Sequence, residues 1–287
     1  MRNLIKLQPI DKATILYLLI SILLIYVNTI INTHDYTNLY IATIMRGVIL
    51  FIMITSIKLN LKYNNCILKI IRNAYPIGFL GYLYPETRLS KNIFFDDLDH
   101  YCIYLDKIIF GINPAIEFSS YIQSVWTNEL LNFGYSCYFI IIILVPVIFY
   151  YKRPQSVSRV LFIIITSFYT YYLIYCLVPI IGPKFFFSSP YNYVSKNGFF
   201  PYIVGILQNT EMPTGAFPSS HVGVTLILLI ICHKYKIKLF YCLIPIFTII
   251  IFATVYIKAH YAIDVIAGII SAFFVYKISA SLYNILS

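Results

Sequence analysis

Charged residues are scarce in this chain of 287 residues, since Asp, Glu, Lys and Arg together make up only 11% of it. Soluble globular proteins carry about 25%, so the composition excludes a water-soluble enzyme. Hydrophobic residues reach 60% and the mean hydropathy is +0.80, which excludes intrinsic disorder. The composition predicts an all-α fold, a polytopic integral membrane bundle of helices.

Cysteine motifs and a cleavage signal are also lacking. The six Cys include no CxxC pair, and three of them (Cys137, Cys176 and Cys232) lie in apolar runs, where Cys acts as a small hydrophobe. The first twelve residues carry charge on both sides of Pro9 and no small-residue cleavage site. We therefore expect an uncleaved first span and not a signal peptide.

Apolar stretches long enough to cross the ~30 Å hydrocarbon core of a membrane recur along the chain. Segment 67–85 is ambiguous because Lys69 and Arg72 interrupt it, and residues 95–125 predict an amphipathic helix at the membrane surface. The clear candidates are residues 13–32, 38–57, 131–151, 159–181, 219–233, 239–257 and 261–281.

The net charge of +10 is unevenly distributed. Loops 58–72, 152–159 and 234–238 contain Lys or Arg and no acidic residue, whereas seven acidic residues fall in 86–130. By the positive-inside rule the basic loops are cytoplasmic and the acidic segment is outside. Segment 67–85 must then cross, which favours about eight spans with both termini inside. The positive charge therefore indicates orientation and not a nucleic-acid partner.

A first motif, Gly215-Ala-Phe-Pro-Ser-Ser-His221-Val-Gly223, ends an outer loop and opens an apolar helix. Ser219 or Ser220 can cap the helix, and its unpaired N–H groups suit an anion such as phosphate. His221 would lie in the first turn. A capped span with an interfacial His that has no function is the other interpretation of this motif.

A second motif places His260 and Asp264 four residues apart at the outer end of the next span. On a helix they would share one face, and a carboxylate on one imidazole nitrogen leaves the other basic. An ionised Asp is costly within an apolar span, so we favour a functional pair over a structural clasp. A metal site would want a third or fourth ligand, and none stands beside them; we expect no metal and no cofactor.

Together, Phe217-Pro-Ser-Ser-His221 and His260-x-x-x-Asp264 resemble the second and third motifs of the type 2 phosphatidic acid phosphatase superfamily. The Gly-Ala before Phe217 resembles the inositol phosphorylceramide synthase branch. The resemblance is specific over 182–268. It implies N-terminal spans (1–66) followed by a membrane catalytic domain (67–287) with a six-helix core.

The resemblance also implies a reaction through phosphohistidine, without metal. His260 would be the nucleophile, Asp264 would orient it, and His221 would be the acid and then the base. Ser219, Ser220 and nearby N–H groups would hold phosphate oxygens. The substrate would be a lipid with a phosphorylated headgroup in the bilayer, and the acceptor would be water or a lipid alcohol.

Two phosphate-binding Arg residues of the family are absent. Lys184 is not followed by Arg-Pro at the spacing of the first motif, and Thr254 stands where the third motif has Arg. Lys184 and Lys258 are the cations left near the site, so we expect Lys184 to contact phosphate; Lys258 would either do so or extend to the interface. The missing Arg residues favour a transferase over a hydrolase of a lipid phosphate, either a polyprenyl phosphate or phosphatidic acid.

Other polar residues are open to two interpretations. Asp96, Asp97, Asp99 and His100 would be a divalent cation site or, as such runs more often are, a solvated face. Arg46 would pair within the bundle or lie nearer a helix end. A transporter would spread ionisable residues along several spans, whereas here they gather at the outer boundary. We therefore expect an integral membrane enzyme of the cell or inner membrane, with its site on the extracytoplasmic or lumenal side.

Overall fold

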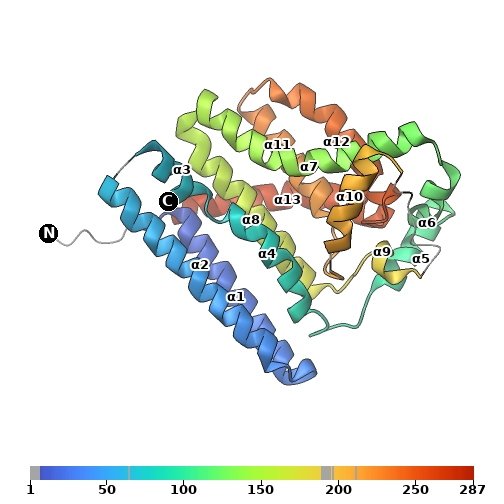
Figure 1. The fold of residues 1–287 in the computed structure, drawn as a ribbon, viewed down its shortest axis with the longest axis horizontal. Helices are drawn as coiled ribbons and strands as arrows, with labels where there is room; N and C mark the ends of the chain where they lie inside the picture. Colours follow the sequence, from blue (N-terminus) through green and yellow to red (C-terminus); the bar gives the residue numbers. More distant parts are fainter. Residues whose placement is uncertain (1–6, 64, 189–194, 196, 211) are drawn as a thin grey trace.

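A computed structural model describes residues 7–63, 65–188, 195, 197–210 and 212–287 of the chain (Figure 1). These residues form helices joined by turns and loops, and no strand occurs among them. The α-helices are α1 (Pro9–Asn28), α2 (Tyr36–Tyr63), α3 (Cys66–Ala74), α4 (Ile77–Glu86), α5 (Asp99–Phe110), α6 (Pro114–Tyr121), α7 (Val125–Lys152), α8 (Val157–Leu177), α9 (Pro183–Phe186), α10 (Phe199–Thr210), α11 (Ser220–Lys234), α12 (Leu239–Tyr256) and α13 (Ala262–Leu286).

Six helices of the described chain are long and apolar enough to cross a membrane: α1 with its π-helical extension to Thr33, α2, α7, α8 with the 3-10 turn at Pro154–Ser156, α12 and α13. Helix α11, of 15 residues, is apolar but shorter. The protein is therefore a polytopic helical membrane protein, as its composition predicts.

Segment 67–85 does not form the single crossing helix that the orientation pattern predicts. It divides into α3 and α4, of 9 and 10 residues, which meet at Tyr75 and Pro76. Proline has no backbone N–H to donate, so the helical hydrogen-bond pattern is interrupted at Pro76. This segment is therefore a pair of short helices joined at Tyr75 and Pro76.

The predicted surface helix at 95–125 is two helices, α5 and α6, and the faces of α5 are the reverse of those of a helix on a soluble protein. Asp99, Cys102 and Asp106 are buried, whereas Tyr104 and Ile108 are exposed. An apolar face directed outward suits the boundary of a membrane. The buried acidic face packs against α13.

Helices α11 and α13 pack closely because glycines line their contact. A Cβ atom at Gly268 would lie 2.7 Å from the Ser219 carbonyl oxygen, and one at Gly223 would lie 3.2 Å from the Gly268 oxygen. Small residues at such a crossing let two backbones approach in a membrane. This contact brings the two sequence motifs together, since α11 carries His221 and α13 carries Asp264.

The α1–α2 pair lies at one edge of the molecule (Figure 1) and is held there by buried ion pairs. Asp11 of α1 pairs with Arg72 of α3, and Arg46 of α2 contacts Glu86 of α4 through both guanidinium NH groups, each at 2.9 Å. Of the two interpretations of Arg46, pairing within the bundle is the one the structure bears out. Charges inside a membrane protein need such partners.

Candidate active site

The two motif histidines lie in contact. Nδ1 of His221 is 3.1 Å from Nε2 of His260, and the rings meet nearly edge to face. Helix α11 positions His221, whose ring packs against Tyr135 and Tyr138 of α7 at centroid distances of 4.9 and 4.4 Å. His260 is buried, with 4% of its surface exposed. The pair therefore presents two ring nitrogens to the same small volume.

Asp264 lies behind His260, on the side away from His221. Its Oδ2 is 3.5 Å from Nδ1 of His260, an ion-pair contact without a hydrogen bond. The carboxylate also accepts hydrogen bonds from the Tyr261 backbone N–H at 2.8 Å and from the Cys102 thiol at 3.7 Å. A proton on Nδ1 would face this carboxylate, which leaves Nε2 as the basic nitrogen directed at His221.

His260 and Asp264 do not share a helix face, contrary to the sequence prediction. Helix α13 begins at Ala262, with Tyr261 as its N-cap, so His260 lies in the loop before it. The His260 N–H is held by the Thr254 carbonyl at 3.1 Å, at the position where the family motif has Arg. Asp264 is in the first turn of α13, and the loop folds back over that turn to bring His260 beside it.

Ser219 is the N-cap of α11, as its sequence predicts: its hydroxyl accepts a hydrogen bond from the Val222 N–H at 3.4 Å. Ser219 is fully buried, whereas Ser220 lines a cavity with His221. Tyr175 of α8 accepts from the Ser220 N–H and donates to the Pro218 carbonyl. Gly215 packs against the Tyr175 ring so closely that a Cβ atom would collide with it. This contact fixes the approach of the motif to the helix.

Lys184 lies beside the histidines, as its place in the sequence predicts. It lines a cavity of about 20 Å³ with His221 and His260, and its ammonium donates to the Gln208 carbonyl. The Lys184 N–H donates to the Lys258 carbonyl at 3.0 Å, which joins the two loops that carry the site. A cavity of this size holds about one water molecule, so a phosphate needs the site to widen.

Lys258 points away from the histidines. Its ammonium donates to the carbonyls of Ala115 and Ile116 in α6, at 3.0 and 3.3 Å, and the side chain is 2% exposed. Burial lowers the pKa of Lys258 to about 8. The Lys258 ammonium thus joins the 257–261 loop to α6 and does not point toward the two histidines.

Two acidic residues that the sequence does not mark as part of the site hold its loops in place. Asp106 of α5 accepts hydrogen bonds from the Ala262 and Ile263 N–H groups, at 3.0 and 2.8 Å, and so caps the start of α13. Burial raises the pKa of Asp106 to about 6. At neutral pH it is a carboxylate at the positive end of the helix dipole, where a negative charge is stabilising.

Asp99 lies about two helical turns before Asp106, on the same face of α5, and holds the other loop of the site at Ile181 and Gly182. Its two oxygens accept from the Ile181 and Gly182 N–H groups, each at 2.9 Å, and from the Tyr261 hydroxyl at 2.9 Å. Burial raises the pKa of Asp99 above its usual value. The spacing of Asp99, Cys102 and Asp106 places them on one helix face, and this periodicity is the signal that could have identified them.

Asp96, Asp97 and His100 do not form a cation site with Asp99. Lys91 pairs with Asp97 at 3.3 Å, and the His100 ring packs on Tyr101. Among the described residues, no group of three or more His, Cys, Asp or Glu side chains is arranged to hold a metal ion.

A family model described as the PAP2 superfamily matches residues 107–278, more than half of the chain. The chain belongs to the PAP2 superfamily. The match contains both motifs, together with Lys184, and it begins after Asp106. No curated protein and no solved structure matches the chain.

PAP2 proteins are phosphatases and phosphotransferases that act on lipid phosphates, so membership supports an enzyme of this general class over a transporter. The site has the groups that such chemistry needs. It offers one ring nitrogen backed by a carboxylate, a second ring within hydrogen-bonding distance, and one lysine beside both.

We predict that Asp106→Asn lowers kcat by up to about 100-fold with little change in KM, because a displaced loop misplaces His260 relative to a bound phosphate. In the Asn side chain an NH₂ group replaces one of the two accepting oxygens, so either the Ala262 N–H or the Ile263 N–H loses its acceptor. Turnover of a lipid phosphate by the full-length protein, corrected for the folded fraction, measures the effect.

Asp97→Asn is the matched control, because this carboxylate is half-exposed and its described partners, Lys91 and Asn92, lie outside the histidine site. It should leave kcat unchanged. A kcat of Asp106→Asn equal to that of the wild type would show that the cap does not position the site.

Proposed function

We propose that the protein transfers or removes a phosphoryl or phosphodiester headgroup on a membrane lipid through a phosphohistidine at His260. The observation that carries the proposal is the contact of Nε2 of His260 with Nδ1 of His221 at 3.1 Å, with Asp264 behind His260. Two imidazoles and a carboxylate in line are the groups that an acid, a nucleophile and its orienting partner require.

In the first step Nε2 of His260 attacks phosphorus and the bond from phosphorus to the leaving oxygen breaks. His221, in its protonated form, gives a proton to that oxygen. Asp264 offsets the positive charge that develops on the His260 ring, whose Nδ1 faces it. The present distance of 3.1 Å leaves no room for phosphorus between the rings, so binding must part them; catalytic contacts of unliganded enzymes often rearrange in this way.

In the second step the now neutral His221 takes a proton from the acceptor hydroxyl. The acceptor oxygen attacks phosphorus, the N–P bond breaks, and His260 returns to its starting form. With water as the acceptor the reaction is hydrolysis; with a lipid alcohol it is transfer. Neither step needs a metal.

Phosphate oxygens would be held by Lys184 and by the start of α11. Lys184 lines the same small cavity as the two histidines, and Ser220 is in the first turn of α11 next to His221. Ser219 would act indirectly, because its hydroxyl caps the helix. The positive end of the helix dipole adds to the attraction. Lys258 is omitted from this set because its ammonium is bound to α6.

The finer assignment is to the inositol phosphorylceramide synthase-like branch, with the 67–287 segment as the catalytic unit and its site on the extracytoplasmic or lumenal side. The Gly-Ala-Phe-Pro-Ser motif and Thr254 in place of Arg support this branch, since a phosphodiester carries less charge than a monoester and needs fewer cations. The distribution of basic loops supports the orientation. The alternative is hydrolysis of a lipid phosphate, either a polyprenyl phosphate or phosphatidic acid.

We predict that His260→Ala abolishes headgroup release and that His221→Ala lowers it by about 10²–10⁴-fold, the usual contribution of general acid–base catalysis. His233→Ala is the matched control, because His233 lies at the other end of α11 from His221 and packs on Phe240. The assay uses the purified full-length protein with phospholipid and lipid phosphate substrates. Unchanged release in both site variants would refute the assignment, and loss of wild-type activity in EDTA would point to a metal.

We predict that ceramide accelerates headgroup release from a phosphodiester substrate and appears in the product with the headgroup attached. Release at the same rate without ceramide, with free headgroup phosphate as the product, would instead support the hydrolase. Mass spectrometry of the lipid products distinguishes the two outcomes.

A further inference from the structure

A closed ring of hydrogen bonds joins three segments beside the histidines: α9, α10 and the 257–261 loop. Lys184 of α9 enters the ring twice, because its backbone N–H donates to the Lys258 carbonyl at 3.0 Å and its ammonium donates to the Gln208 carbonyl of α10. The Gln208 side chain closes the ring, since its Nε2 donates to the Ile257 carbonyl at 3.1 Å. We call these three hydrogen bonds the lysine clamp.

The α10 end of the lysine clamp is a place where a cation is stabilised. Helix α10 ends at Thr210, so the Gln208 carbonyl is among the last four of the helix, for which helix geometry provides no N–H partner. The negative end of the helix dipole lies at the same place. The Lys184 ammonium therefore satisfies a carbonyl of the last turn, at a position that the backbone of α10 sets.

The other end of α10 is anchored to α7. Glu129 of α7 accepts hydrogen bonds from the Phe199 and Phe200 N–H groups, at 2.6 and 3.1 Å, and so caps the start of α10. Between the two ends, Val204 is buried in an apolar cluster that includes Tyr135 of α7. Because the helix is held to α7 in this way, its last turn is a fixed support for the lysine.

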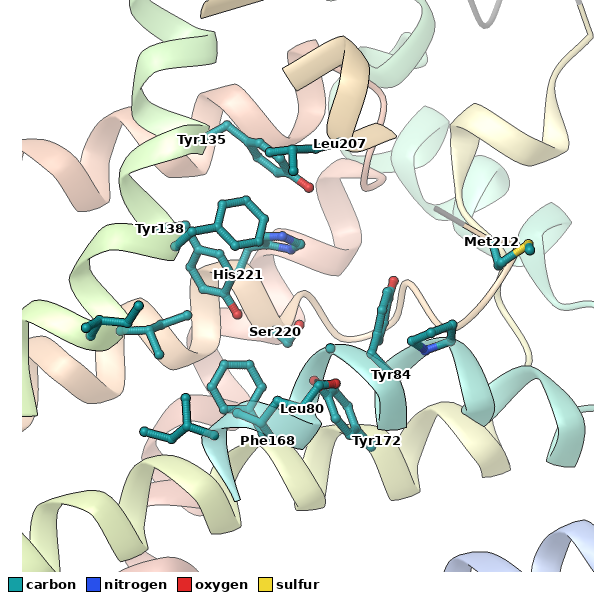
Figure 2. A pocket seen from close by; sticks show the side chains of 16 residues that line it. Leu80, Tyr84, Tyr135, Tyr138, Phe168, Tyr172, Leu207, Met212, Ser220 and His221 are labelled. Atoms are coloured by element: carbon teal, nitrogen blue, oxygen red, sulfur yellow. Dashed lines mark hydrogen bonds between the residues drawn. The ribbon is translucent and has the colours of Figure 1, made fainter. Parts of the chain in front are cut away.

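Helix α10 reaches the histidine site at the level of the lysine clamp. Leu207 lines a cavity of about 420 Å³ with His221, and Figure 2 shows both side chains at this cavity. Lys184 lines the smaller cavity with His221 and His260. An ammonium carries three hydrogens, so its hydrogen bond to the Gln208 carbonyl orients it without using them all. The clamp is thus compatible with a phosphate oxygen on the same ammonium.

The lysine clamp also relates the cation to the nucleophile. The two loop carbonyls that it uses lie within three residues of His260, so they belong to the loop that carries this histidine. The Gln208 amide is the side-chain contact of the clamp that ties α10 to that loop. Without it, the last turn of α10 and the Lys184 ammonium lose a fixed position relative to His260.

We propose that Gln208 is a positioning residue of the reaction: its amide fixes the last turn of α10 to the His260 loop, and its carbonyl thereby holds the Lys184 ammonium where that cation binds phosphate. The inference rests on the proposed function, because it takes Lys184 as the phosphate-binding cation. Since the two motif Arg residues of the family are absent, phosphate binding depends on where this lysine is placed. Gln208 acts through Lys184 and not on the substrate.

Inorganic phosphate is the probe, because calorimetry measures its equilibrium binding to the purified full-length protein without any turnover. Gln208→Leu removes the amide donor, and Gln208→Glu keeps the side-chain length but sets an oxygen against the Ile257 carbonyl. Leu, Glu and Gln are all helix formers, so α10 is retained. Each is also combined with Lys184→Met, which removes the ammonium, because a double-mutant cycle shows whether two residues act as one unit.

We expect Gln208→Leu and Gln208→Glu each to weaken phosphate binding about tenfold, as loss of a hydrogen bond to a charged group does, and to raise KM for a lipid phosphate more than they lower kcat. Lys184→Met should weaken phosphate binding at least as much. Each double variant should bind phosphate no more weakly than Lys184→Met alone, a result that a merely structural role of Gln208 would not produce.

Gln123→Leu is the matched control, because this exposed amide donates to the Ser120 carbonyl, outside the histidine site. It should leave phosphate affinity unchanged. Gel filtration and the thermal midpoint identify folded variants, and Gln208→Glu decides the test where Gln208→Leu does not fold.

Unchanged phosphate affinity in a folded Gln208 variant or in Lys184→Met would overturn the inference, and so would a wild type that binds no inorganic phosphate. Losses that multiply in the double variants would overturn it too, because Gln208 would then act independently of Lys184. A failure of the proposed function is seen separately: headgroup release by His260→Ala contradicts the histidine chemistry, whereas the phosphate affinities are measured without turnover.

Discussion

Buried carboxylates that accept backbone N–H groups are the interactions on which this site depends. His260 lies in a loop and Lys184 in α9, a helix of four residues, and the segments around them carry N–H groups that need acceptors. Asp99, Asp106 and Asp264 supply them, and each contacts the loop before α13 or its first turn. The acidic face of α5 is therefore directed inward, and the loops it holds carry the histidine to a fixed position.

The sequence predicts those parts of the molecule that follow from local rules. Apolar runs locate the six long helices and α11, because hydrocarbon imposes a minimum length. Ser219 is the N-cap that its position before an apolar run indicates. The proximity of His221 and His260 is also foreseeable, since the first motif opens α11 and the second lies after α12, where the chain returns to the same end of the bundle. Glycines at the α11–α13 contact agree with it.

The parts that could not be predicted depend on contacts between distant segments. Asp99 and Asp106 look like surface acids because their partners, at 181–182 and 261–263, are remote in sequence. Four-residue spacing suggests that His260 shares a helix with Asp264, but the capping of α13 at Tyr261 starts the helix later. The break at Pro76 replaces an expected span by two short helices.

The central claim is that His260 carries the phosphoryl group in the reaction. Incubating the full-length protein with phosphorus-labelled lipid phosphate, quenching it within a turnover, and mapping the label by mass spectrometry tests this directly. The account predicts an acid-labile phosphate on Nε2 of His260 that is absent from His260→Ala. Label on His221, or turnover by direct transfer with no labelled histidine, would contradict it.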